Sequence, residues 1–531
     1  MTDAAKPADW ELGAFSDDPP WVIERDRLRW LPPLTAARRS IRRELPQLTR
    51  AEFLPPAARV TKVTRHLGWA VGRWAIGKRR AGGSASRADL SRRLRIAAEA
   101  LGPTYIKLAQ IISSGEGLFP EELVVETKKC RDQVPAETWE TVRTVVEEDL
   151  GRPIPELFSS FDTEPLAAAS IAQVHRATLR TGEDVVVKVQ RPTVAIRVRQ
   201  DLRVMAWIAP KLVGRIPVAA LANPPALVEL FAETIAEELD FRLEAENMLD
   251  VAHAFAELGQ RGYVVPRPHP ELVTPRVLVM ERLDGFKFDD VAGMKDAGVD
   301  TEQVVRTGMI GFMEGALIHG IFHGDLHGGN LFVRPDGRTA LLDFGITGRL
   351  DQFKRTAFLR MLVAGTSNDV KGQLAAFRDL GALPPDTDLD AVIHDLGLDT
   401  GEVFDPTKVD GDELVNEIQR TIKALLGYGA RIPKELMLFV KNLMFIDGAI
   451  ATLAPDLDIL NEIAQVTMYF ATQHGETIAK QLGMADVGWE FDMDGVKAGM
   501  GLGDDVERLT YRDLQARREI IRKRLEGRRL S

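Results

Sequence analysis

The chain has 531 residues, an apolar fraction of 45% and a formal net charge of −10, which leaves room for two or more globular domains. Its single cysteine, Cys130, excludes an intramolecular disulfide and favours a reducing compartment. The acidic start, MTDAAKPADWELG, and the lack of any run of about 18 uncharged apolar residues predict neither a signal peptide nor a transmembrane helix.

The charge is distributed unevenly along the chain. Residues 25–95 hold 19 Lys and Arg against four acidic residues, and residues 506–531 hold nine against four. The stretch between them therefore carries a negative charge larger than that of the whole chain. Basic ends on an acidic body favour a negatively charged partner for those ends.

Residues 1–86 are predicted to hold a disordered lead-in over 1–20, basic helices over 21–80 and a flexible joint, AGGSAS, at 81–86. Prolines would interrupt the helices at Pro32-Pro33, Pro46 and Pro55-Pro56. The segment Val60–Ile76 has one apolar face, basic residues on its other faces, and Trp69. The apolar positions are Val60, Val63, Leu67, Val71 and Trp74, and the basic ones are Arg59, Lys62, Arg65 and Arg73.

A basic amphipathic helix with a tryptophan suits an anionic membrane surface. The same apolar stripe would also dock the helix on the rest of the protein, so both interpretations stay open. Nucleic acid is a third possible partner, but no base-reading motif supports it, and we expect none.

Residues 87–150 are predicted to be helical and contain LGPTYIKLAQ, in which Lys107 alone would indicate only a surface position. From residue 151 the pattern changes to strands. Lys188 ends the apolar run Val185–Val187, after a turn at Thr181–Asp184. This is the context of the kinase strand lysine that pairs with nucleotide phosphates, although a lysine on an edge strand would look the same.

Helical periodicity resumes near Leu227 and carries Glu238, Asp240 and Glu244, of which the last two lie four residues apart on one helix face. One such carboxylate would hold Lys188 in place, although acidic residues on a helix are usually just solvated. The apolar strand in RVLVMERLDGF then ends at Met280-Glu281 and looks like the connection between two lobes.

The most informative stretch is FHGDLHGGNLFVRPDGRTALLDFG, residues 322–345. Asp325 and Asn330 have the spacing D-x-x-x-x-N, and Asp343 opens DFG after two short strands joined by a Pro-Asp-Gly turn. Phosphoryl transfer to a hydroxyl needs one carboxylate to orient the acceptor, and an amide and a second carboxylate to hold metal ions. The pattern therefore favours a phosphotransfer site.

Two other interpretations of this stretch stay open. One is a hairpin whose aspartates are merely solvated at its turns. The other is a zinc site on His323 and His327, which is weaker because no cysteine or third clear ligand accompanies the two histidines.

Further helices are expected at 302–320, 351–380, 410–425 and 433–480, and a basic helix at 509–530. The late GMGLG at 499–503 has no strand before it, so we expect a flexible joint there. Where a protein kinase has G-x-G-x-x-G before its strand lysine, this chain has Ala167-Ala168-Ala169-Ser170. Because alanine restricts the backbone approach that glycine allows, this loop is expected to hold nucleotide differently.

The stretches LGPTYIKLAQ, AAASIAQVH, VVVKVQRP, ELDFRLEAEN, FHGDLHGGN and LLDFG together resemble the UbiB/AarF family of atypical protein-kinase-like proteins, over about residues 96–460. The resemblance implies an α+β, protein-kinase-like two-lobed fold with an N-terminal helical extension over the active site. The extension would span 87–150, the N-lobe 151–285, the C-lobe 286–480, and a joint with a basic helix 481–531. It also implies binding of ATP or ADP with Mg²⁺, and a link to isoprenoid-quinone or other prenyl-lipid metabolism at a membrane.

Carried over by position, the resemblance assigns the catalytic base to Asp325, the phosphate lysine to Lys188 and its helix partner to Glu244. The remaining assignments are nucleotide contacts at Ala167, Ala168, Ala169, Ser170, Met280 and Glu281, metal ligands at Asn330 and Asp343, the K-x-G-Q signature of the extension at Lys107 and Gln110, and its E-x-D partner at Glu238 and Asp240.

The chain departs from the family pattern at three places. Ala109 replaces the glycine of K-x-G-Q, Ala172 replaces the glycine usual after the alanine loop, and SSGEGLFP lacks an Arg and an Asp usual after the extension motif. These changes bear on how the extension closes the site and leave the nucleotide and metal residues intact.

We therefore expect an ATP-binding atypical kinase or ATPase in the cytoplasm, peripheral on the inner face of the membrane. Its expected partners are an anionic membrane surface and a prenyl lipid, and its protein substrate is unknown. A small-molecule phosphotransferase of the aminoglycoside or choline kinase type shares HGD-x-x-x-x-N, but is not expected to have the alanine loop or the K-x-x-Q helix. A non-catalytic, nucleotide-dependent lipid-binding protein is the third alternative.

Overall fold

The computed structural model describes residues 14–17, 19–50, 57–77, 83–113, 119–130, 135–212, 224–260, 262–366, 369–398, 425, 427–430, 433–483, 493, 496–497, 502–503 and 506–527. The chain divides into two compact units. The first is Met1–Asp284 with Ala340–Thr347, and the second is Gly285–Thr339 with Gly348–Ser531. Each unit has hydrophobic clusters of its own.

The first unit contains an antiparallel sheet with the strand order β1-β3-β4-β7-β6, and β2 pairs with β3 beside this path. A short strand, β5 (Tyr263–Val264), precedes β6. The sheet strands are β1 (Phe158–Phe161), β2 (Ala167–Ala168), β3 (Ala172–Leu179), β4 (Asp184–Gln190), β6 (Pro268–Val273) and β7 (Val277–Glu281).

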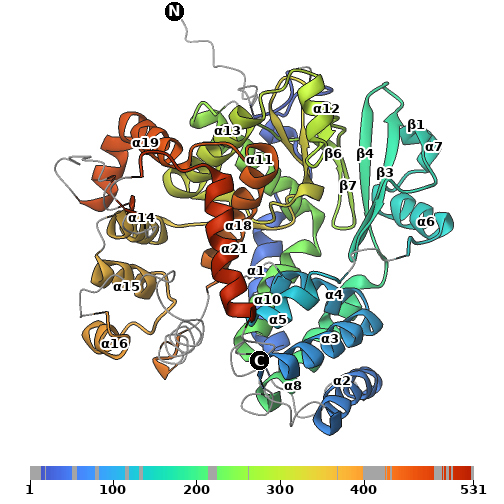
Figure 1. Ribbon diagram of the computed structural model, residues 1–531. Helices are drawn as coiled ribbons and strands as arrows, with labels where there is room; N and C mark the ends of the chain where they lie inside the picture. Colours follow the sequence, from blue (N-terminus) through green and yellow to red (C-terminus); the bar gives the residue numbers. More distant parts are fainter. Residues whose placement is uncertain are drawn as a thin grey trace, which may run out of the picture. The chain divides into compact units, whose positions relative to one another are not determined.

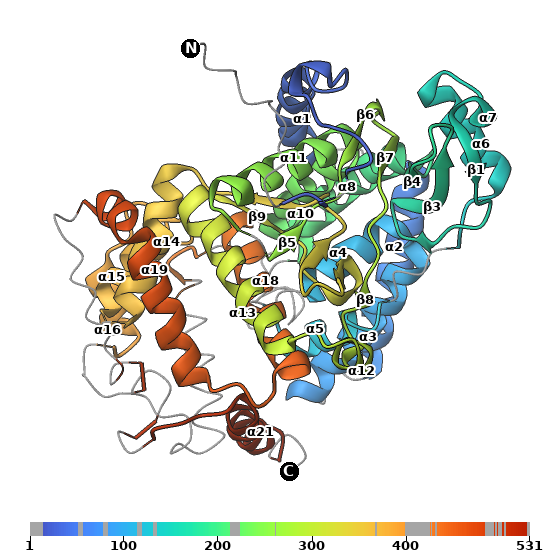
Figure 2. The ribbon, with the colours of Figure 1, turned by 90° about the horizontal axis from the view of Figure 1, so that it is seen from above.

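Along the chain, helices come before the strands of this sheet and also between β4 and β5. Before it come η1 (Arg25–Arg27), α1 (Leu34–Thr49), α2 (Ala57–Gly77), α3 (Gly83–Leu101), α4 (Pro103–Ser113), α5 (Glu121–Thr127), α6 (Trp139–Leu150) and α7 (Ile154–Leu157). After β4 come α8 (Val194–Leu212), α10 (Pro224–Glu238) and α11 (Phe241–Glu257). In both views α6 and α7 lie beside β1 and β3 (Figures 1 and 2).

The sequence of β4, DVVVKVQ, buries alternate residues. Val185, Val187 and Val189 join the core that α6 covers, together with the apolar residues of β7. Because successive side chains of a strand point to opposite faces, this alternation turns Lys188 away from that core. The β-branched valines also favour the extended backbone.

Helix α2 packs along α3 through one side (Figure 1). Trp74 is 3% exposed and joins a cluster with Leu90 of α3 and Leu123 of α5, while its indole nitrogen donates to the Ser86 carbonyl at 3.1 Å. The docked interpretation of this helix is therefore confirmed. Its other side remains exposed, and Trp69 is 55% and Ile76 90% exposed.

The segment before α1 packs against β6. Its buried side chains include Phe15, Ile23, Leu28 and Trp30, and the indole nitrogens of Trp21 and Trp30 donate to the carbonyls of Pro268 and His269 at 3.1 and 3.2 Å. The prediction of a disordered lead-in is wrong for the described residues 14–17 and 19–20, because aromatic residues spread along the segment bury it on the sheet. Residues 1–13 and 18 lie outside the described ranges.

Packing also determines the protonation of His269. Burial lowers the pKa of His269 to about 4, and its Nδ1 accepts the backbone N–H groups of Glu271 and Leu272 at 3.0 Å each. Only a neutral ring can accept at Nδ1 in this way. The histidine thus stabilises the irregular backbone of β6, in which all three residues lie.

Three further expectations for the first unit are corrected. Pro46 lies inside α1 rather than ending it, which is tolerated because this part of the helix is exposed and the carbonyl that loses its partner can bind water. The joint AGGSAS is helical from Gly83 onward, where α3 begins. The single helix expected after Leu227 is two helices, α10 and α11, with Asp240 between them in an extended conformation.

The second unit is mainly helical. Its first part has β8 (Phe286–Lys287), α12 (Val291–Asp296), α13 (Thr301–Met313), a π-helical turn η3 (Glu314–His319), β9 (Ile321–His323), η4 (Gly328–Asn330) and β10 (Leu331–Val333). The strands β11 (Thr339–Leu341) and β12 (Thr347–Arg349) flank the DFG stretch, and the segment Ala340–Thr347 belongs to the first unit. The later helices are α14 (Gln352–Thr366), α15 (Val370–Asp379), α16 (Leu389–Asp395), α18 (Lys434–Leu453), α19 (Ile459–Leu482) and α21 (Tyr511–Gly527).

Phe439 of α18 lies at the centre of the core of this unit. Its ring centroid is 4.7 Å from that of Phe358 on α14, 5.2 Å from that of Phe312 on α13 and 6.1 Å from that of Phe322 on β9. Figure 2 shows α15 next to α14, α16 next to α15, and α19 beside α14. The aromatic cluster fixes β9, and therefore the loop after it, against α18.

The predicted helices of this unit are present with breaks. The stretch 351–380 forms α14 and α15, and 433–480 forms α18 and α19. The helix expected at 410–425 falls outside the described residues except for Leu425, as does GMGLG before Leu502.

Candidate active site

Lys188 lies on a central strand. Its backbone pairs with Val174 of β3 on one side and with Leu278 of β7 on the other, so the interpretation as an edge-strand lysine is wrong. Its ammonium donates to both carboxylate oxygens of Glu244, at 2.7 and 3.0 Å, and to Asp343 Oδ2 at 3.0 Å.

This cluster is buried on one side and open on the other. The side chains of Lys188 and Glu244 are 12% and 3% exposed, whereas that of Asp343 is 41% exposed. Burial lowers the pKa of Lys188, but the charges of Asp343 and Glu244 raise it by more, so the pKa stays above its ordinary value. The lysine is therefore charged.

Helix α11 also fixes the DFG turn. Asn247, one turn after Glu244 on the same helix face, donates its side-chain amide to the Phe344 carbonyl at 2.9 Å. Asp343 Oδ1 accepts the Gly345 N–H at 2.9 Å. The strand lysine, the helix glutamate and the DFG aspartate are thus held in one arrangement within the first unit.

The extension reaches the same neighbourhood through Lys107. Its ammonium lies 3.0 Å from Glu238 Oε2, and the Glu238 side chain lies against Gly345, where an added Cβ would be 3.4 Å from Glu238 Cγ. Gln110 is half-buried on α4, one turn further along.

Asp240 does not join this pair. It caps α11 by accepting the Arg242 N–H at 3.1 Å, and it pairs with the Arg242 guanidinium at 2.6 Å. The expectation that Asp240 and Glu244 share a helix face is therefore wrong, because Asp240 precedes the helix. Aspartate is a favoured N-cap residue, and Asp240 directly before Phe241 is the local signal of this cap.

The alanine loop is closed by hydrogen bonds. Ala167 and Ala168 pair with Val174 and Gln173 of β3, and the Ala169 N–H donates to the Ala172 carbonyl at 2.8 Å. Arg191 donates its Nε to the Ala169 carbonyl at 3.0 Å, and its Nη1 to Glu137 at 2.9 Å. Ser170, beyond the strand, is buried.

Met280 and Glu281 end β7, and both are buried. The Glu281 carboxylate accepts the Ser16 hydroxyl and the Arg267 N–H, the latter at 3.2 Å. Arg267 Nη1 in turn donates to the Ser16 carbonyl at 3.0 Å. The Glu281 side chain thus anchors the N-terminal segment, and the Glu281 N–H donates to the Arg267 carbonyl at 2.9 Å.

In the second unit, histidine rings and an amide shape the loop after β9. His323 Nδ1 accepts the Asp325 N–H at 3.1 Å, and His327 Nδ1 accepts the Gly329 N–H at 3.0 Å. Asn330 donates its amide nitrogen to the Asp325 carbonyl at 3.1 Å. The two histidines act as caps of the loop backbone, which disfavours the zinc interpretation.

Sequence reasoning missed two residues on α18. Lys441 donates to Asp325 Oδ1, and Asn442, which is fully buried, donates to the His323 carbonyl and accepts the Leu326 N–H at 3.2 Å. Their only sequence signal is a Lys-Asn pair in the middle of an otherwise apolar stretch.

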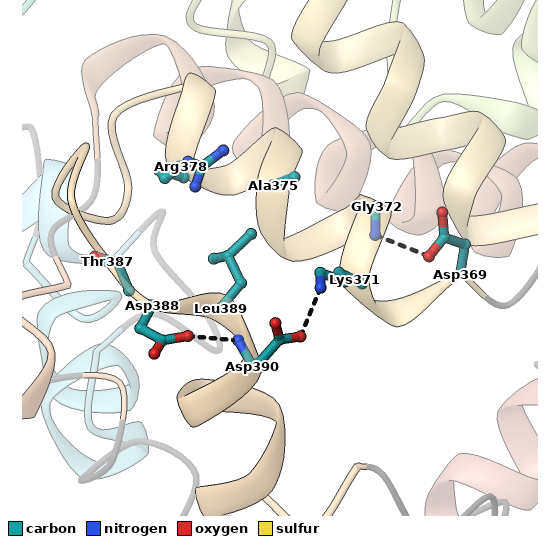
Figure 3. Close-up of a pocket in the computed structure, with 9 residues that line it drawn as sticks. All are labelled: Asp369, Lys371, Gly372, Ala375, Arg378, Thr387, Asp388, Leu389 and Asp390. Carbon is teal, nitrogen blue, oxygen red and sulfur yellow. Dashed lines mark hydrogen bonds and ion pairs between the residues drawn. The ribbon is translucent and has the colours of Figure 1, made fainter.

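The described part of the chain also has a surface depression away from these residues, and it holds no cluster of metal ligands. No group of three or more His, Cys, Asp or Glu side chains there could hold a metal by itself. A depression of about 540 Å³ near α15 and α16 is lined by polar groups that bond to one another (Figure 3). Asp369 and Asp388 cap the two helices, and Lys371 pairs with Asp390 at 2.6 Å.

One helix in the described ranges, α18, is long and apolar enough to cross a membrane, with a mean hydropathy of 1.6 over its most apolar window. Half of that window is buried. Because Lys441 and Asn442 bind the Asp325 loop, we treat α18 as a core helix of the second unit.

A central strand lysine held by a helix glutamate, a DFG aspartate and a D-x-x-x-x-N loop define a protein-kinase-like class, with an α+β fold. The model of the ABC1 atypical kinase-like domain matches residues 129–376. The Mycobacterium tuberculosis protein Rv0647c is 37% identical over 381 residues, which are 70% of this chain and 76% of that protein. The chain belongs to the ABC1/UbiB (aarF-domain) family of atypical kinase-like proteins, which confirms the resemblance.

Other relatives carry kinase names. The probable protein kinase UbiB of Pseudomonas fluorescens (strain Pf0-1) is 33% identical over 382 residues, covering 70% of each chain. The chloroplastic protein ACTIVITY OF BC1 COMPLEX KINASE 1 of Arabidopsis thaliana is 33% identical over 366 residues, covering 68% of this chain and 52% of that one.

Proposed function

We propose that this protein binds ATP or ADP with Mg²⁺ and acts as an atypical kinase or ATPase, peripheral on the inner face of a membrane, in support of isoprenoid-quinone or other prenyl-lipid metabolism. The observation that carries the proposal is the Lys188–Glu244–Asp343 arrangement. The lipid link rests on family membership. Because the chain belongs to this family, we favour this proposal over a small-molecule phosphotransferase of the aminoglycoside or choline kinase type.

The residues present fit a nucleotide with Mg²⁺. Asp343 offers a carboxylate that is 41% exposed, and Asn330 carries an amide oxygen, and both are the hard oxygen ligands that Mg²⁺ takes. Lys188, oriented by Glu244, offers its charge to the phosphates. Asp325 has the carboxylate that would orient an acceptor oxygen. Bound Mg²⁺ would neutralise charge on the phosphates.

The test of the proposal is nucleotide binding and hydrolysis. We expect ATP with Mg²⁺ to raise the melting temperature of the parent chain, and Asp343→Asn to lose that Mg²⁺-dependent shift, because the charged metal ligand is gone. Hydrolysis is measured in parallel, with and without anionic liposomes. An Asp343→Asn variant with the parent's shift would remove Asp343 from the site.

The membrane contact that we propose is the outer side of α2. It presents Trp69 and Ile76 together with the exposed Lys62, Arg65 and Arg73, and the helix contains no acidic residue. The Arg73 guanidinium lies 5.2 Å from the centre of the Trp69 ring. Aromatic and basic side chains together suit the interface of an anionic bilayer.

Charge reversal tests this contact. The double variant Arg65→Glu, Arg73→Glu should bind vesicles that contain an anionic phospholipid more than about tenfold more weakly, since each basic residue near such a surface contributes about 1 kcal/mol. The matched control is Arg42→Glu, Arg43→Glu on α1, where the same change falls on an exposed face without exposed large apolar side chains. Equal pelleting of both variants and the parent would count against the contact.

A further inference from the structure

The loop from His323 to Asn330 contains the proposed catalytic carboxylate but neither Lys nor Arg. Phosphoryl transfer places negative charge beside this carboxylate, and cations there stabilise the transition state. The structure supplies one from a distant segment, because Lys441 of α18 donates to Asp325 Oδ1. The two side chains are 15% and 17% exposed, so the pair is partly screened from water.

The next residue on the helix fixes the loop backbone. Asn442 is fully buried, and its amide donates to the His323 carbonyl and accepts the Leu326 N–H. These two contacts lie on either side of Asp325 in the sequence. A single side chain therefore holds both flanks of the residue that Lys441 contacts.

Helix α18 is itself rigidly placed. Phe439 packs on Phe322, directly before His323, and the Phe445 ring centroid lies 5.1 Å from that of Phe288. Phe288 in turn lies against Gly328, whose added Cβ would be 3.5 Å from its ring. The helix thus supports the loop before and after Asp325.

We propose that Lys441 is a positioning residue of the active site: it fixes Asp325 Oδ1, so that Oδ2 faces the acceptor, and Asn442 holds the loop for this pairing. The proposal rests on the proposed function. In the transfer step the acceptor oxygen bonds to the γ-phosphorus of ATP, and the acceptor's proton passes to Asp325. The bond from that phosphorus to the β–γ bridging oxygen breaks, and ADP leaves with its electron pair.

The experiment is a double-mutant cycle on ATP hydrolysis. Lys441→Met should lower kcat by about tenfold to a hundredfold with KM for ATP within about twofold, because the contact serves the transition state rather than nucleotide binding. Lys441→Arg should recover most of the loss, since it restores the charge. In the Asp325→Asn background, Lys441→Met should have no further effect.

The matched control is Lys354→Met. Lys354 also forms an ion pair with α18, at Glu435 and 2.7 Å, but away from the loop. It should keep the parent's kcat. ADP affinity, measured as the thermal shift that ADP with Mg²⁺ causes in each variant, should match that of the parent. Lys441→Gln serves as the second neutral variant if the Met variant folds poorly.

The outcomes separate the inference from the function on which it rests. An active parent with an equally active Lys441→Met variant would overturn the inference alone. Additive losses in the Asp325→Asn background would also overturn it, because Lys441 would then act on the nucleotide directly. A parent that neither binds nor hydrolyses nucleotide would overturn the proposed function and this inference with it.

Discussion

Replacing Lys188 by Met should lower the free energy of unfolding by about 3–5 kcal/mol and abolish stabilisation by ATP with Mg²⁺. Glu244 is 3% exposed and accepts from the ammonium with both oxygens. Removing the lysine leaves this carboxylate buried without its partner, and the loss of one member of a buried pair has about that effect. The phosphates lose the same cation.

A second substitution separates stability from binding. In the double variant Lys188→Met, Glu244→Met the buried charge is gone, and replacing a buried ion pair by apolar residues of similar volume is often close to neutral. Asp343 can be solvated because it is 41% exposed. Urea denaturation should therefore show most of the lost stability restored, while the thermal shift with ATP and Mg²⁺ stays absent.

The control is an exposed ion pair of the same unit. Arg143 and Glu147 of α6 lie 3.2 Å apart with side chains 59% and 25% exposed, so Arg143→Met should change stability by less than about 0.5 kcal/mol. A Lys188→Met variant as stable as the parent would contradict the buried-charge argument. A double variant that still responds to ATP would show that the nucleotide binds elsewhere.

The parts of the site that could be predicted from sequence are those whose chemistry fixes both residue type and order. The strand lysine, the D-x-x-x-x-N loop and DFG are recognisable because phosphoryl transfer requires a particular residue type at each position, and because the residues within each motif are separated by a short, fixed number of positions. In the structure the Lys188 ammonium indeed lies within 3.0 Å of carboxylate oxygens of both Glu244 and Asp343. The family membership follows from the same motifs.

Contacts between distant segments had no such signal. Lys441 and Asn442 lie 116 and 119 residues from Asp325 and His323, their partners, and a Lys-Asn pair in an apolar helix has no periodicity of its own. Burial of the N-terminal segment was also missed, because Phe15 and Trp30 are spaced for an irregular chain on a sheet rather than for a helix. The pattern of residues along a short stretch predicts its secondary structure. It does not predict these contacts, because they depend on how distant segments pack together.

Arg59→Met is expected to destabilise the first unit by about 3–5 kcal/mol. Asp201 of α8 is completely buried, and its carboxylate accepts from Arg59 through both Nε and Nη2, the latter at 2.9 Å. The same guanidinium donates to the Leu101 carbonyl at the end of α3 at 2.9 Å. Without it a buried carboxylate and a helix-terminal carbonyl lose their donor at once.

The matched control on the same helix is Arg65→Met. Arg65 lies on the exposed side of α2, so its replacement should change the free energy of unfolding, measured by urea denaturation, by no more than a typical surface substitution, within about 0.5 kcal/mol. The double variant Arg59→Met, Asp201→Leu should regain much of the lost stability because no buried charge remains.

The same variants should differ in membrane binding. Since Arg59 joins α2 to α3 and α8, its loss should loosen the helix that we expect to contact the membrane. Arg65→Met should instead weaken vesicle binding without affecting stability. Equal stability of the Arg59→Met and Arg65→Met variants would show that α2 is held by its apolar stripe alone.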